Sequence, residues 1–166
     1  MKVFRLAKEK PGRYRADDLS GSGAALAGGR WNPRGVPVLY TCCHASTAVL
    51  EARVHASGLL PVANFYLVTL EVPERAASSA YVPDLPDDWN ALDHDPASTV
   101  NLARQWLEAG KRLAMRVPSV VCPNDDNLIL NPAHPGMKAR GGTAQTALRA
   151  GPATVQINPA GTAVVR

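Results

Sequence analysis

Short stretches in which apolar, β-branched and aromatic residues gather between Pro, Gly and Asn predict the β-strands of this chain. The clearest is 64–72, Asn-Phe-Tyr-Leu-Val-Thr-Leu-Glu-Val, which stops at Pro73. Residues 2–5 alternate between polar and apolar character, and 36–41 follow a break at Gly35. The predicted strands are 2–5, 36–41, 64–72, 113–122 and 128–131, with 154–158 as a weaker candidate.

Two further stretches predict helices. Residues 45–57 combine Ala, Val and Leu with a cap at Ser46 or Thr47 and a stop at Gly58. Residues 98–109 begin at a capping serine, place a leucine and a tryptophan four positions apart, and end before a glycine. Because helices and strands do not alternate regularly, the pattern predicts an α+β fold rather than a doubly wound parallel sheet.

The segments between these elements predict loops. Residues 17–29 are rich in Gly, Ser and Ala, and 83–96 are rich in Pro and Asp. Pro-Asn-Asp-Asp-Asn at 123–127 predicts a turn between the last two main strands. With 166 residues, the chain is expected to form one domain.

Composition excludes several classes of protein. Hydrophobic residues make up 46% and charged residues 19%, which is typical of a globular chain rather than a disordered one. No apolar run approaches the roughly 18–20 residues that cross a bilayer, so no membrane association is expected. Charges interrupt the first residues too often for a signal peptide, which predicts a cytoplasmic protein.

Charge and cysteine usage narrow the choice further. The net charge of +4 lies wholly in residues 131–166, where four isolated cations without interleaved aromatics do not predict direct nucleic-acid binding. Cys42 and Cys43 are adjacent, Cys122 is distant, and the four histidines are scattered. This spacing predicts neither a disulfide framework nor a metal site.

The candidate chemistry lies in four residues with distinctive neighbours. Arg30 stands in Gly-Gly-Arg-Trp-Asn, Tyr40 in Val-Leu-Tyr-Thr, Glu51 in Ala-Val-Leu-Glu-Ala-Arg, and Ser119 in Arg-Val-Pro-Ser-Val-Val. An arginine, an aromatic ring and a helical carboxylate can together hold a diphosphate, flank a flat leaving group and stabilise positive charge on a sugar. Cleavage of the nicotinamide–ribose bond of NAD requires these capabilities.

These residues resemble the RES domain, a family named for its Arg, Glu and Ser. The resemblance covers about 5–134 and includes Gly29-Arg30-Trp31-Asn32, Tyr40, Glu51, Pro118-Ser119 and Asn131-Pro132-Ala133-His134. It implies an NAD-binding catalytic domain over 1–134, with 135–166 as an atypical Ala/Gly/Thr-rich C-terminal segment of the same domain. The implied fold is similar to the ADP-ribosyltransferase toxins, with two packed β-sheets, peripheral helices and an NAD cleft.

The resemblance also implies a function. The family comprises toxins of type II toxin–antitoxin systems, whose usual partner is an Xre-like antitoxin, and a homodimer within that complex is one expected arrangement. NAD+ would be the substrate, not a redox cofactor. Water or phosphate as the acceptor would make the protein an NAD+ glycohydrolase or phosphorylase. A protein acceptor would make it a mono-ADP-ribosyltransferase, and a non-catalytic nucleotide-binding module is a further alternative.

Position by position, the resemblance implies that Arg30 contacts the NAD phosphates or the neighbouring ribose and that Tyr40 stacks on or flanks the nicotinamide. Glu51 would stabilise the oxocarbenium-like sugar. The residues alone also permit an exposed loop arginine and a core tyrosine. For Glu51 they permit a solvated helical glutamate or a pairing with His55.

Three more residues belong to the predicted substrate site. Ser119 would donate a hydrogen bond to phosphate or ribose, although a plain strand serine is the alternative. Asn131 is a polar lining residue or part of an Asn-Pro turn. Trp31 closes a wall of the cleft or belongs to the core. No Gly-x-Gly-x-x-Gly follows a strand, which argues against redox use of NAD.

Overall fold

Five antiparallel strands form the main sheet, in the order β3-β1-β2-β5-β4. The computed structural model describes residues 1–10, 12–13, 15–55, 65–91, 95–137, 155–157 and 163–165. The strands are β1 (Lys2–Lys8), β2 (Leu39–Cys42), β3 (Phe65–Glu71), β4 (Ala114–Pro118) and β5 (Asp126–Leu130). A separate two-stranded sheet pairs β6 (Val155–Ile157) with β7 (Ala163–Val165).

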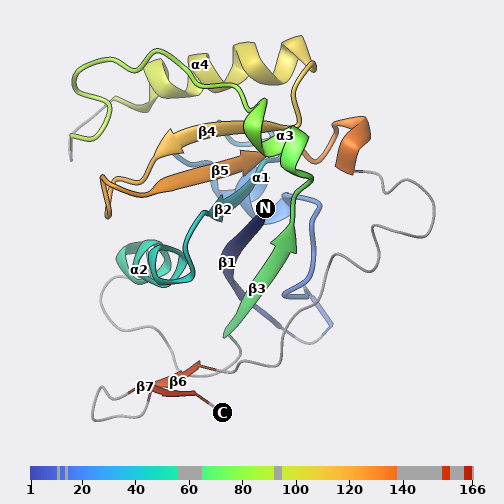
Figure 1. Ribbon diagram of the computed structural model, residues 1–166, viewed down its shortest axis with the longest axis vertical. Helices are drawn as coiled ribbons and strands as arrows, with labels where there is room; N and C mark the ends of the chain where they lie inside the picture. The colour runs from blue at the N-terminus through green and yellow to red at the C-terminus, as the bar shows by residue number, and fades with distance from the viewer. Residues whose placement is uncertain are drawn as a thin grey trace.

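The main sheet consists of two halves. β1 pairs with β3 along its whole length, from Lys2↔Glu71 to Lys8↔Phe65, and β5 pairs with both β2 and β4. The halves meet at a single register pair, Phe4↔Cys42. Because so little pairing joins them, β1 and β3 run steeply across the direction of β4 and β5 (Figure 1). The two expected sheets are therefore two halves of one continuous sheet within an α+β fold.

Two of the described helices are long, α2 (Ala45–His55) and α4 (Pro96–Ala109). The short ones are α1 (Ser22–Ala27), α3 (Glu74–Ser78) and the 3-10 helix η1 (Pro135–Met137). α4 lies alongside β4, and α2 lies beside β2 (Figure 1).

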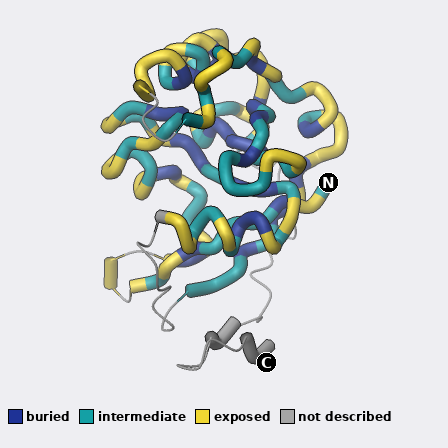
Figure 2. The backbone as a smooth tube through the Cα atoms, turned by 90° about the vertical axis from the view of Figure 1, so that its left-hand side faces the viewer, coloured by how far each residue is buried: buried dark blue, intermediate teal, exposed yellow. Residues whose placement is uncertain are grey.

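Both faces of the sheet are covered. On β5, Leu128 and Leu130 belong to one cluster of buried side chains, whereas Ile129 belongs to the other. The second cluster also contains Trp31 and Trp106, the latter from α4. Buried residues accordingly run along the strands, and exposed ones occupy the outer loops and helical turns (Figure 2). Three consecutive apolar residues on β5 are explained by this burial on both sides.

Both predicted helices are present, and only the second starts at a different residue. α2 begins at Ala45 as expected, and the end predicted beyond residue 55 lies outside the described residues. α4 begins at Pro96 instead of 98, because the Asp95 side chain accepts a hydrogen bond from the Ala97 N–H at 2.9 Å. Proline at the first helical position needs no N–H partner, so Asp95 and not Ser98 caps the helix.

The predicted strand at 36–41 is displaced. β2 starts at Leu39, because the Val36 N–H donates to the Pro33 carbonyl and closes a turn, and Pro37 has no N–H to offer a neighbouring strand. The strand predicted over 113–122 likewise ends at Pro118. Beyond it the chain turns, with the Asp125 N–H donating to the Cys122 carbonyl.

Four of the described elements were absent from the sequence prediction, among them the 3-10 helix η1. α1 lies within the predicted loop 17–29, α3 follows β3, and β7 pairs with β6. α1 and α3 have six and five residues, too few for a helical period to stand out.

Candidate functional site

Arg30 and Trp31 form the tip of a tight two-residue hairpin. The Gly29 N–H donates to the Asn32 carbonyl at 2.8 Å, and the Asn32 N–H donates back to the Gly29 carbonyl at 3.3 Å. This pair of bonds closes the loop, so Arg30 has a defined position directly after the predicted loop 17–29.

Asn32 and Tyr40 fasten this hairpin to the sheet. The Tyr40 hydroxyl donates to Asn32 Oδ1 at 2.7 Å and accepts from the Trp31 N–H at 3.1 Å. The Asn32 amide donates to the carbonyls of Ala24 and Val36 at 2.9 and 3.0 Å. A Cβ on Gly29 would lie 2.8 Å from the Tyr40 hydroxyl. Glycine, asparagine and tyrosine therefore depend on one another in this motif.

The Arg30 residue is also held from the other side. Its guanidinium NH1 donates to the Trp89 carbonyl, and its own carbonyl accepts from Thr99 Oγ1 at 2.7 Å. Trp31 is only 3% exposed, and its ring centroid lies 6.3 Å from that of Trp89. Of the two alternatives for Trp31, the structure supports the core residue.

The Glu51 carboxylate accepts hydrogen bonds from two residues that are distant in the sequence. Its Oε1 accepts from Ser119 Oγ at 2.8 Å and from Asn127 Nδ2 at 2.8 Å. Ser119 follows directly after β4, is fully buried, and accepts a hydrogen bond from the Cys122 N–H at 3.1 Å. The Ser119 hydroxyl therefore positions the carboxylate, and its contact with NAD stays a prediction. The His55 side chain, the alternative partner for Glu51, lies outside the described residues.

The start of α2 is tied to the same β4–β5 turn. The buried Thr47 hydroxyl donates to Asp125 Oδ2, and His44 Nδ1 lies 3.2 Å from Asp125 Oδ1. Thr47, suggested by the sequence as a helix cap, thus serves as an anchor between helix and turn. A carboxylate at this end of α2 also interacts favourably with the helix dipole.

The register of β2 and β5 brings the two halves of the site together. Tyr40 pairs with Ile129, and Cys42 pairs with Asn127. Residues two apart on a strand, and their cross-strand partners, share one face of the sheet. Tyr40 and Asn127 are therefore diagonal neighbours on one face, about 7–8 Å apart. Tyr40 thus lies on β2 between the hairpin that carries Arg30, which its hydroxyl binds, and Asn127, which binds Glu51.

Besides burial, both Arg30 and Glu51 affect the pKa of Tyr40. Burial raises the pKa of the Tyr40 phenol to about 12, assisted by the Glu51 carboxylate and opposed by the Trp31 N–H and the Arg30 guanidinium. Burial, followed by the Glu51 carboxylate, also raises the pKa of the Cys42 thiol to about 12. At neutral pH Tyr40 is a neutral phenol and Cys42 is not a thiolate nucleophile.

Asn131 takes the turn role that the sequence left open. It is 5% exposed, and its Oδ1 accepts from the Ala133 N–H at 2.9 Å. Asn32, Thr47, Asp125 and Asn127 were not predicted as site residues. Only Asn32 stood in a recognisable motif, whereas Asn127 was hidden within a run typical of turns.

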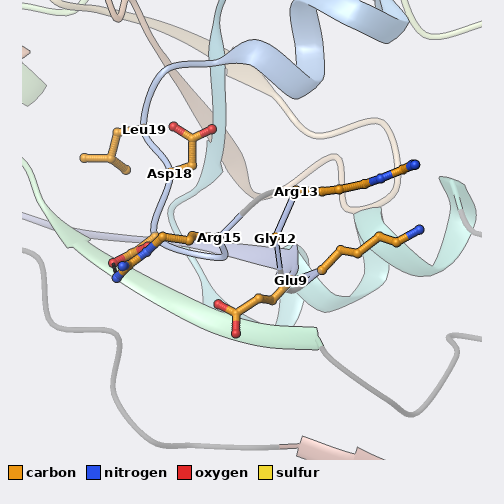
Figure 3. A pocket seen from close by; sticks show the side chains of 8 residues that line it. Glu9, Gly12, Arg13, Arg15, Asp18 and Leu19 are labelled. Atoms are coloured by element: carbon orange, nitrogen blue, oxygen red, sulfur yellow. Dashed lines mark hydrogen bonds and ion pairs between the residues drawn. The ribbon is translucent and has the colours of Figure 1, made fainter.

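A surface concavity lies elsewhere, between β1 and α1. It is lined by Glu9, Lys10, Gly12, Arg13, Arg15, Asp17, Asp18 and Leu19. Arg15 and Asp17 form a bidentate pair at 2.7 Å, and Arg13 extends away from Asp18 and Leu19 (Figure 3). None of the predicted site residues lines it.

No described helix has the length and apolar character to cross a membrane. No group of three or more His, Cys, Asp or Glu side chains stands close enough in the described ranges to hold a metal ion.

Comparison with named proteins gave several relatives. The "Prs ADP-ribosylating toxin" of Sphingobium sp. strain YBL2 is 45% identical over 136 residues, covering 76% of this chain and 82% of the relative. "Toxin Res" of Yersinia enterocolitica is 35% identical over 134 residues, covering 81% and 86%. "Toxin Res" of Pseudomonas putida is 34% identical over 122 residues, covering 71% and 80%.

A solved structure has the same fold. The crystal structure of the M. tuberculosis MbcT–MbcA toxin–antitoxin complex contains a chain that superposes with a TM-score of 0.61 at 19% identity, covering 99% of this chain and 83% of that one. At this identity the likeness concerns the fold alone. The family model described as "RES domain" matches residues 2–149. This chain therefore belongs to the RES-domain family.

Proposed function

We propose that this protein is the toxin component of a toxin–antitoxin system and that it cleaves the nicotinamide–ribose bond of NAD+. One observation carries the proposal: a guanidinium, a phenol and a carboxylate from three separate elements converge around β2. Support also comes from the three relatives described above, all of which are named as toxins.

Arg30 would bind the NAD diphosphate. Its hydrogen bond to the Trp89 carbonyl shows that the guanidinium reaches a neutral acceptor in this state. A charged phosphate oxygen is a stronger acceptor, so the phosphate would replace or share this bond. Tyr40 would flank the nicotinamide with its ring, because its hydroxyl is engaged in the hairpin.

Glu51 would stabilise the positive charge that develops on the ribose. When the bond from the anomeric carbon to the nicotinamide nitrogen breaks, both electrons leave with the nicotinamide, which becomes neutral. The sugar becomes oxocarbenium-like, and a fixed carboxylate lowers the energy of that state. Water or phosphate then attacks the anomeric carbon and gives up its proton to solvent, leaving ADP-ribose or its phosphate ester.

A second candidate keeps the same first step and transfers ADP-ribose to a protein. The name of the Sphingobium relative, an ADP-ribosylating toxin, favours it. An antitoxin would restrain either activity, and the solved toxin–antitoxin complex of the same fold supports such a partner. An Xre-like antitoxin and action on the cytoplasmic NAD pool are part of this proposal.

The test is product analysis of NAD+ incubated with the purified protein, with and without phosphate. A parallel incubation with labelled NAD+ and a cell extract detects transfer of ADP-ribose to protein. Glu51→Gln should lower kcat about 10²- to 10³-fold, because the developing charge loses its carboxylate. Arg30→Ala should raise KM about 10- to 100-fold through loss of a charge-assisted bond. Glu108→Gln and Arg104→Ala, exposed changes on α4, serve as matched controls.

The products distinguish the candidates. Free ADP-ribose means hydrolysis, a phosphorylated product formed only with phosphate means phosphorolysis, and labelled protein means transfer. No nicotinamide under any condition would overturn the proposal and leave a non-catalytic nucleotide-binding module.

A further inference from the structure

Asn127 has an unusual hydrogen-bonding situation. Its Nδ2 donates to Glu51 Oε1 at 2.8 Å, while its Oδ1 is buried without a partner among the described residues. Rotating the amide would bring Oδ1 against the carboxylate oxygen, where two acceptors repel, so the orientation follows from chemistry.

An unpaired buried carbonyl is costly. Leaving such an acceptor without a partner destabilises a folded protein, because the oxygen gives up its hydrogen bonds to water and gains none in return. Native structures contain few of these atoms, and each requires an explanation. At Asn127 the gain is the bond to Glu51, which an apolar side chain of the same size could not make.

The backbone of Asn127 is fixed. The residue pairs with Cys42 on β2 and with Val117 on β4, so strands flank it on both sides. Ser119, which shares the acceptor oxygen, stands just beyond the end of β4. Two donors thus approach Glu51 Oε1 from the sheet, and the one on β5 has a strand on each side.

We infer that Asn127 is a positioning residue for the reaction: it fixes the orientation of the Glu51 carboxylate toward the ribose. The inference rests on the proposed NAD+ cleavage. Asn127 acts through Glu51 and need not touch the substrate. A displacement of about 1 Å in a catalytic group can cost about 10²-fold in rate.

The test compares Asn127→Leu, which keeps the size but removes the amide, with Asn127→Asp, which keeps the shape but replaces the donor with a carboxylate that repels Glu51. Both should lower kcat for nicotinamide release about 10- to 100-fold with KM within about twofold. Asn127→Leu should melt at or above the wild-type temperature. Asn101→Leu, an exposed change on α4, is the matched control.

A double variant separates positioning from general structural damage. If Asn127 acts only through Glu51, adding Asn127→Leu to Glu51→Gln should slow the reaction no further than Glu51→Gln alone. Multiplied losses would overturn the inference, as would folded Asn127 variants with wild-type kcat. If Asn127→Leu does not fold, the kcat of Asn127→Asp decides.

The same assay shows which proposal fails. Wild-type protein that releases no nicotinamide removes the proposed function and this inference together. Wild-type protein that releases nicotinamide at a rate unaffected by Asn127 removes the inference alone.

Discussion

At the scale of single residues, Tyr40 links structure to chemistry. Its hydroxyl joins Trp31 to Asn32, and its ring lies on the face of β2 that leads to Asn127. The sequence singled out Tyr40 by its neighbours and by the family resemblance, whereas its hydrogen bonds to the hairpin appear only in the folded chain. Gly29 has a physical reason as well, since any larger residue would meet the Tyr40 hydroxyl at 2.8 Å.

Tyr40→Phe should destabilise the protein at neutral pH by about 1–3 kcal/mol, because Asn32 Oδ1 and the Trp31 N–H lose a partner. The difference should shrink at alkaline pH. The folded pKa of about 12 exceeds the ordinary value of 10, so the wild-type contribution is complete below pH 10 and lost as pH rises to 12. That loss is on the order of 2–3 kcal/mol.

Urea unfolding of wild type and Tyr40→Phe between pH 7 and 11.5 measures this. A difference that stays constant or widens above pH 10 would contradict the buried neutral phenol. Tyr81→Phe provides a comparison tyrosine.

At the scale of elements, α2 and the β4–β5 turn behave as one unit. Thr47 and His44 contact Asp125 at the start of the helix, and Glu51 contacts Ser119 and Asn127 one turn later. The residue types and the cap in 45–57 predicted a helix, which is confirmed over Ala45–His55, but they did not indicate which side chains of the distant turn contact it. Those contacts depend on where β4 and β5 place the turn.

Asp125→Ala should therefore affect both stability and rate. It leaves the buried Thr47 hydroxyl without this acceptor, at a cost of about 1–3 kcal/mol. Because α2 then loses an anchor, kcat for nicotinamide release should fall about 10-fold or more. Asp17→Ala removes an exposed pair with Arg15, and its effect should be below about 1 kcal/mol.

Melting curves and kcat of the two variants decide the matter. Equal behaviour of Asp125→Ala and Asp17→Ala would mean that the turn does not hold the helix.

At the scale of the whole molecule, the sheet is an inner layer with apolar side chains on both faces. Leu128 points into one cluster and Ile129 into the other, and neither is exposed. The site lies where the two halves of the sheet meet, since Cys42 at that junction pairs with both Phe4 and Asn127. The relation of the site to the junction is a property of the entire fold.

Leu128→Ala and Ile129→Ala should each lower the free energy of unfolding by about 2–5 kcal/mol, because each leaves a cavity in a packed cluster. Leu26→Ala, at a position 82% exposed, should change it by less than about 0.5 kcal/mol. Denaturant titration measures all three. A small loss at only one of the two β5 positions would indicate that one face of the sheet is poorly packed.

The sequence by itself determined the main elements and the identity of Arg30, Tyr40 and Glu51 as candidates. Helix caps, helix and strand breakers and residue periodicity depend on a few neighbouring residues, so the sequence alone is enough to recognise them. It did not reveal the short α1 and α3 or the start of β2, where turn bonds and a proline outweighed a run of apolar residues.

Only the tertiary structure decided how the candidates are used. It buried Trp31, gave Asn131 to a turn, and brought Ser119 and Asn127 to Glu51 across 68 and 76 residues of chain. The reason is physical. Hydrogen bonds between distant residues depend on strand order and register, which follow from packing of the whole core and not from any local pattern.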